Sequence, residues 1–108
     1  MDDFPLGDVD LDERVLNAAG PVLLVFEAAW SGPSQQLEPV IDEIAAEREG
    51  KIKVVKVDID KNPLIVAKYG VRACPTIILF SGGRPLSTKV GSLPKAKLLD
   101  WLDSLSLE

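Results

Sequence analysis

The chain alternates short apolar runs with stretches that are apolar along only one face. Two runs, at 21–28 and 52–60, are rich in β-branched residues, which is typical of strands that are covered on both faces. A third region, 74–91, places a Gly-Gly pair between two further apolar runs, and this pattern predicts a β-hairpin. Pro85 interrupts the second of those runs and therefore indicates a strand at the edge of a sheet.

Between these strands, apolar side chains recur at helical spacing or lie between helix start and stop signals. In the segment 62–70, Asn62 is expected to cap the helix and Pro63 to occupy its first turn. The predicted helices cover 10–19, 34–49, 62–70 and 94–105, and a further strand is predicted within 2–9. Helices that first alternate with strands and then give way to a hairpin predict an α/β fold with a mixed sheet. The whole chain, 1–108, is expected to form one domain.

Composition narrows the range of functions. The 108 residues include 17 acidic and 12 basic side chains, for a net charge of −5, and no stripe of Lys or Arg suggests nucleic-acid binding. No apolar stretch is long enough to span a membrane, and the first residues lack the pattern of a secretory leader, so a cytoplasmic location is expected. One cysteine and no histidine cannot supply an internal disulfide or a usual zinc site, and no metal or cofactor is expected.

The segment WSGPS at 30–34, followed far downstream by the pair Cys74-Pro75, resembles the W-C-G-P-C motif and the cis-proline of the thioredoxin family. The resemblance extends from the first predicted helix to the last. It implies a thioredoxin fold, with a mixed sheet of four to five strands flanked by helices on both faces. It also implies descent from protein-disulfide reductases, whose two motif cysteines perform thiol–disulfide exchange.

This chain carries Ser31 and Ser34 at the two cysteine positions of the family. A serine hydroxyl provides no thiolate equivalent near neutral pH and forms no disulfide, so no dithiol–disulfide oxidoreductase activity is expected from the chain as written. Two further positions differ. Val25 stands where active relatives keep a buried aspartate for proton transfer, and Glu27 stands where they keep an aromatic residue. These departures favour a loss of redox function over a simple exchange of two cysteines.

The leading hypothesis is a redox-inactive protein that binds a protein or peptide partner in the groove around the motif and the cis-proline loop. By resemblance, the peptide-binding residues are Trp30, Gly32, Pro33, Ala73, Cys74, Pro75, Gly91 and Ser92. The oligomeric state is left open, with a monomer among the options.

Two alternatives remain open. In the first, the chain is the Cys-to-Ser form of a thioredoxin that acts as a protein-disulfide oxidoreductase in cell redox homeostasis. In the second, Cys74 is a single reactive thiol that takes glutathione or a partner's cysteine and serves as a redox sensor. Each side chain also has a purely structural interpretation: Ser31 can cap the following helix, and Cys74 can be a small half-buried apolar residue.

Overall fold

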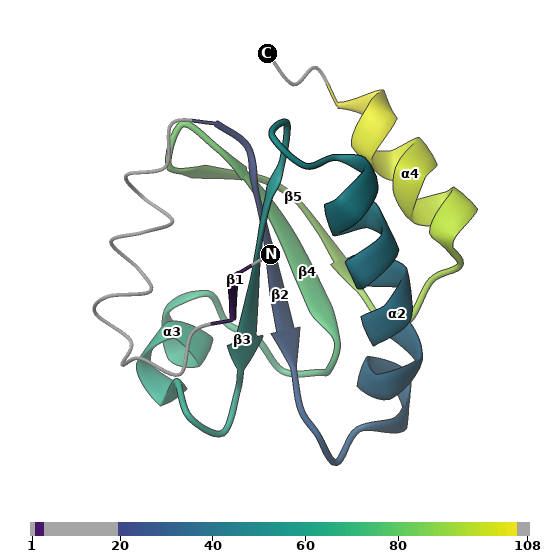
Figure 1. Cartoon of the computed structure of the whole chain (residues 1–108). Coiled ribbons are helices and arrows are strands. Elements are labelled where there is room, and N and C mark those ends of the chain that lie inside the picture. The colour runs from purple at the N-terminus through teal and green to yellow at the C-terminus, as the bar shows by residue number, and fades with distance from the viewer. Residues whose placement is uncertain (1, 4–19, 106–108) are drawn as a thin grey trace.

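The computed structural model describes residues 2–3 and 20–105, and these residues form a five-stranded mixed sheet (Figure 1). The strand order is β1-β3-β2-β4-β5, in which β1, β3 and β2 run parallel while β4 and β5 run antiparallel to their neighbours. The strands are β1 (Asp2–Asp3), β2 (Val22–Glu27), β3 (Lys53–Asp58), β4 (Thr76–Ser81) and β5 (Arg84–Val90). The predicted mixed sheet is confirmed, whereas the helix predicted at 10–19 and most of the strand predicted within 2–9 lie outside the described residues.

Helices cover both faces of the sheet, as predicted. Helices α2 (Gly32–Glu47) and α4 (Lys95–Ser104) pack on one face, and α3 (Pro63–Lys68) packs on the other (Figure 1). Helix α2 begins two residues before the predicted start at 34, because the residue before it, Ser31, provides the cap. The last helix ends within one residue of the predicted boundary, which is the usual uncertainty of helix ends.

The first five residues of β2, 22–26, are all apolar and all buried. Alternate side chains of a strand point to opposite faces of the sheet. Leu23 and Val25 therefore enter the core beneath α2 and α4, while Leu24 and Phe26 enter the core on the α3 face. All four are at most 1% exposed, so this strand is buried on both sides and its C-terminal end is held in a defined position.

The hairpin of β4 and β5 forms one edge of the sheet. Gly82 and Gly83 have φ values of +60° and +77°, which L-residues with a side chain rarely adopt, and this explains the Gly-Gly turn. Pro85 lies on the outer strand opposite Phe80, next to an irregularity in the strand pairing, so the predicted edge position is confirmed. On the inner side, the indole N–H of Trp101 donates to the Ser87 hydroxyl at 2.9 Å and ties α4 to the hairpin.

Asn62 occupies the predicted N-cap position of α3, but its side chain makes no capping hydrogen bond. Asn62 is fully buried, and its amide donates to the backbone carbonyl of Asp58 at 2.9 Å instead of accepting from the helix. The physical reason is burial, because a fully buried amide N–H must find an acceptor inside the protein, and the Asp58 carbonyl provides one. The same carbonyl also accepts from the Lys61 N–H at 3.1 Å, so the Asn62 amide stabilises the turn that leads from β3 to α3.

Candidate functional site

The candidate site lies at the edge of the sheet where β2 and β3 end and β4 begins (Figure 1). Strand pairing places Thr76 of β4 between Phe26 at the end of β2 and Val90 at the end of β5. The Cys74–Pro75 peptide bond is cis, and the Pro75 carbonyl accepts a hydrogen bond from the Gly91 N–H at 2.8 Å. Three loops that are distant in sequence therefore meet here: the WSGPS motif, the segment before β4, and the segment after β5.

The two serines are held in local hydrogen bonds at the start of α2. The Ser31 hydroxyl accepts from the Ser34 backbone N–H at 3.3 Å and donates to the Cys74 carbonyl at 3.5 Å. The Ser34 hydroxyl accepts from the Ala28 N–H at 3.4 Å, and both serines are buried. The capping role predicted for Ser31 is confirmed. Within the described residues, both hydroxyls are bonded to backbone groups, and the chain has no histidine to act as a general base.

Cys74 is half-buried beside the Ser31 hydroxyl. Burial raises the pKa of its thiol, and the negative charges of Asp60, Asp58 and Glu27 raise that pKa further. A reactive cysteine needs the opposite environment, one that stabilises the thiolate. The surroundings of Cys74 therefore favour a protonated, weakly nucleophilic thiol.

Trp30 is the most exposed of the large apolar side chains in the described part of the chain, with 69% of its surface accessible. Its indole N–H donates to the Asp60 carboxylate at 3.0 Å. Asp60 is itself held in the loop after β3, where its N–H bonds the Asp58 carboxylate at 2.9 Å. The indole therefore has a fixed anchor at one edge, while much of its surface faces solvent.

The other residues predicted to bind a peptide differ in their exposure. Gly32, Pro33, Ala73 and Ser92 are exposed, Cys74 and Gly91 are half-buried, and Pro75 is buried. We call the accessible set, with Trp30, the motif surface; it comprises Trp30, Gly32, Pro33, Ala73, Cys74, Gly91 and Ser92. Pro75 is not part of this surface, but its carbonyl accepts the hydrogen bond from the Gly91 N–H.

Sequence reasoning missed the role of Asp60. In the sequence it reads as part of a solvated strand end, because nothing within one element connects it to a tryptophan 30 residues earlier. The tertiary structure brings the loop after β3 against the loop after β2, since these two parallel strands end at the same edge of the sheet. The parallel pairing of the two predicted strands was the signal that could have placed Asp60 near Trp30.

Val25 lies in the apolar core, 1% exposed, directly opposite Lys56 in the pairing of β2 with β3. The Lys56 ammonium is buried but pairs with α2, 2.9 Å from the Asp42 carboxylate and 3.9 Å from that of Glu38. Burial by itself lowers the pKa of Lys56, but the contact with Asp42 and the charges of Asp42, Glu38 and Glu27 outweigh it and raise the pKa. The ammonium of Lys56, which lies opposite Val25 in the strand pairing, is thus already neutralised by carboxylates of α2.

We expect Asp42→Asn to lower the free energy of unfolding by about 1–2 kcal/mol at neutral pH. Removing one partner of a buried pair costs several kcal/mol, and the partial exposure of Asp42 reduces that figure. The raised pKa of Lys56 stabilises the fold below its ordinary pKa of 10.5, and this contribution is lost as the pH rises through the higher folded value. Urea unfolding between pH 7 and 11 should therefore show a smaller alkaline loss in Asp42→Asn than in wild type.

Glu49→Gln removes one exposed carboxylate just beyond α2 and provides the matched control for this comparison. It should leave stability within about 0.5 kcal/mol of wild type. Equal stability of the Asp42 and Glu49 variants at every pH would contradict the ion-pair assignment.

The described ranges, 2–3 and 20–105, contain neither a candidate metal site nor a helix that could span a membrane. Within them, no three or more His, Cys, Asp or Glu side chains are grouped as metal ligands. The helices found there are too short or too polar to cross a bilayer.

The fold and the site together define an α/β protein of the thioredoxin-like class, with a helix start facing a cis-proline loop. The family model for thioredoxin matches residues 4–104. Thioredoxin from Rickettsia felis is 47% identical over 96 residues, covering 89% of this chain and 91% of that protein. Thioredoxin 1 from Nostoc sp. is 45% identical over 89% of this chain and 90% of its own length, and thioredoxin from Rhodospirillum rubrum is 41% identical over 92% and 95%. The chain belongs to the thioredoxin family.

Proposed function

We propose that this protein is a redox-inactive member of its family that binds a polypeptide partner through the motif surface. The observation that carries this proposal is the state of Ser31 and Ser34, whose hydroxyls are buried and occupied by backbone groups. Thiol–disulfide exchange needs two sulfur atoms there. The motif surface around them, in contrast, keeps an exposed tryptophan and lies against the cis-proline loop.

The exposed indole supports binding on energetic grounds. Tryptophan is among the residues most often found to dominate interface energies. Trp30 is anchored to Asp60, so less side-chain entropy is lost when a partner covers the ring. The motif surface also contains small exposed residues, Gly32 and Ala73, which allow a polypeptide backbone to approach closely.

The test uses Trp30 as its own reporter. The chain has two tryptophans, of which Trp101 is buried and Trp30 is exposed. Trp101→Phe removes the buried indole, so the remaining emission comes from Trp30 alone. We expect titration with reduced and alkylated insulin B chain, an unfolded polypeptide without free thiols, to shift Trp30 emission to the blue as the ring leaves water. Binding measured by calorimetry should weaken by at least about tenfold in Trp30→Ala, the loss typical of an interface anchor.

A matched control is Leu64→Ala, which removes a similarly exposed apolar side chain, 66% accessible, from α3. It should bind as wild type does. Unchanged emission and no binding heat at millimolar peptide would contradict the proposal.

A second candidate function is protein-disulfide oxidoreduction by a chain in which cysteines occupy positions 31 and 34. The relatives named thioredoxin favour it, as does the position of Ser31 at the start of a helix, where a thiol would be activated. The redox-sensor alternative at Cys74 is less well supported, because the environment raises the pKa of that thiol. A cytoplasmic location and a monomeric state complete the proposal.

A further inference from the structure

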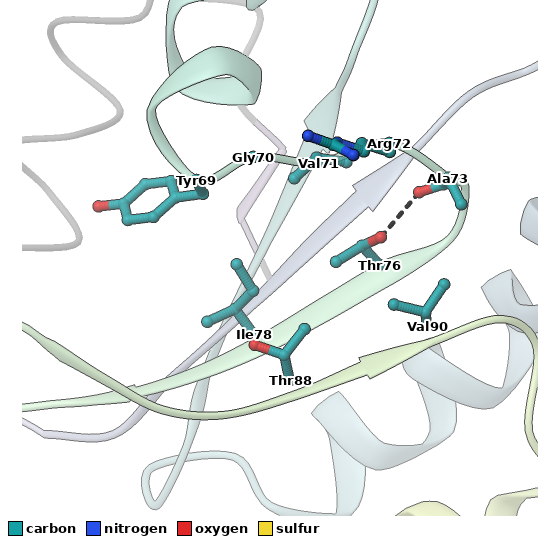
Figure 2. A pocket seen from close by; sticks show the side chains of 9 residues that line it. All are labelled: Tyr69, Gly70, Val71, Arg72, Ala73, Thr76, Ile78, Thr88 and Val90. Atoms are coloured by element: carbon teal, nitrogen blue, oxygen red, sulfur yellow. Dashed lines mark hydrogen bonds between the residues drawn. The ribbon is translucent and has the colours of Figure 1, made fainter.

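A hollow of about 210 Å³ lies beside the motif surface, on the α3 side of the hairpin (Figure 2). Its wall is the segment 69–73, and the rest of its lining comes from Thr76 and Ile78 of β4 and from Thr88 and Val90 of β5. Pockets for whole small molecules begin at roughly 300 Å³. This hollow is smaller, so its volume suits one or two side chains of a larger partner.

The lining is mostly apolar and open to solvent. Val90 is 61% exposed, and Ile78 forms part of the floor (Figure 2). The Thr76 hydroxyl is already used, since it donates to the Ala73 carbonyl at 2.7 Å. Ala73 belongs both to this wall and to the motif surface, and Val90 directly precedes Gly91, so the two regions form one continuous surface.

Arg72 is the only charged side chain among the nine residues that line the hollow. It is exposed, and it forms no ion pair with any residue that the structure describes. An unpaired guanidinium beside an apolar hollow provides an always-charged donor for a carboxylate.

Charge is divided unevenly along the chain and across the site. From 61 to 99 the sequence contains seven basic residues and no acidic one, although the protein as a whole has a net charge of −5. Within the motif surface, Trp30 bonds the Asp60 carboxylate, and Asp58, Asp60 and Glu27 act on the Cys74 thiol. The sign of the charge therefore changes across the surface, from negative beside Trp30 to positive at Arg72.

We infer that the bound partner extends from the motif surface into this hollow, where it places an apolar side chain and, next to it, an acidic residue against Arg72. The inference rests on the proposed function and names the chemistry of its partner: an acidic, apolar polypeptide segment. A nucleic acid fits less well, because the hollow offers one cation and apolar walls instead of a row of cations along a phosphate backbone.

The experiment titrates the isotope-labelled full chain with three synthetic peptides, followed by amide NMR. The peptides share a Val-Leu-Val centre and differ in flanking residues, which are Asp, Ser or Lys. We expect the Asp peptide to shift the amides of Val71, Ala73, Thr88 and Val90, and to bind about threefold to fivefold more tightly than the Ser peptide, as one partly exposed ion pair allows. Arg72→Ala should remove that advantage, and Arg72→Glu should transfer it to the Lys peptide.

Arg84→Ala is the matched control, because it removes an exposed cation of β5 that does not line the hollow. It should leave the preference for the Asp peptide unchanged. Equal affinities for all three peptides, a preference unaffected by Arg72→Glu, or the absence of shifts at millimolar peptide would overturn the inference. Stronger shifts of the same amides by an oligothymidylate would also overturn it, in favour of a nucleic-acid site.

The two proposals fail in different ways. Shifts confined to Gly32, Cys74 and Gly91 would support binding at the motif surface and reject the hollow. Shifts at Val71 and Val90 that Trp30→Ala leaves intact would support the hollow as an acidic-peptide site and count against the role of Trp30.

Discussion

The double variant Ser31→Cys/Ser34→Cys is expected to reduce insulin disulfides with dithiothreitol at least about tenfold faster than wild type, which should match the rate without protein. The reason is geometric. Position 31 caps α2, and the Ser31 side chain already accepts a hydrogen bond from the backbone N–H of Ser34, so a thiolate there would be stabilised by the start of the helix. Position 34 is one turn away and would supply the resolving thiol.

Two control variants make this result specific. Ser31→Cys alone should show no sustained turnover, because it lacks a resolving partner in the motif. The second control is the triple variant Ser31→Cys/Ser34→Cys/Cys74→Ala. It prevents an unproductive disulfide between positions 31 and 74, which are close because the Cys74 carbonyl lies 3.5 Å from the Ser31 hydroxyl. If the triple variant is no faster than wild type, the scaffold has lost more than its sulfur atoms. Rapid turnover by wild type would contradict the proposed loss of redox function.

The variant Val25→Asp is expected to lower the free energy of unfolding by about 4 kcal/mol at neutral pH. Val25 is 1% exposed in an apolar core, and full burial can raise the pKa of a carboxyl by three or more units, each equivalent to about 1.4 kcal/mol. Lys56, directly opposite in the strand pairing, offers limited compensation because it already pairs with Asp42. Chemical denaturation measures the loss.

The dependence on pH identifies the cause of that loss. Between pH 3.9 and the raised folded pKa, the unfolded variant releases its proton while the folded variant keeps it, so the stability of Val25→Asp falls as the pH rises. Val25→Asn buries a side chain of the same size that does not titrate, and its stability deficit should stay constant over that range. Parallel profiles for the two variants would show that the cost is one of packing and polarity alone.

Much of the fold follows from local patterns that operate over a few residues. The continuous apolar run of β2, the Gly-Gly turn before Pro85, and the spacing of Leu98, Trp101 and Leu102 in α4 each predict their element. Local signals failed at Asn62, whose side chain follows the demand of burial instead of helix capping. Burial depends on which elements pack together, and the periodicity of one segment does not contain that information.

For the candidate site, too, some conclusions follow from residue identity alone and others only from tertiary contacts. The sequence alone determined that Ser31 and Ser34 exclude dithiol chemistry, because that conclusion depends only on which atoms are present. Only the tertiary structure decided that Asp60 holds Trp30, that Lys56 pairs with Asp42, and that Arg72 borders an apolar hollow beside the cis-proline loop. The physical reason is that element identity arises from short-range preferences of the backbone, whereas the Trp30–Asp60 and Lys56–Asp42 contacts join different elements and loops that are 30 and 14 residues apart in the chain.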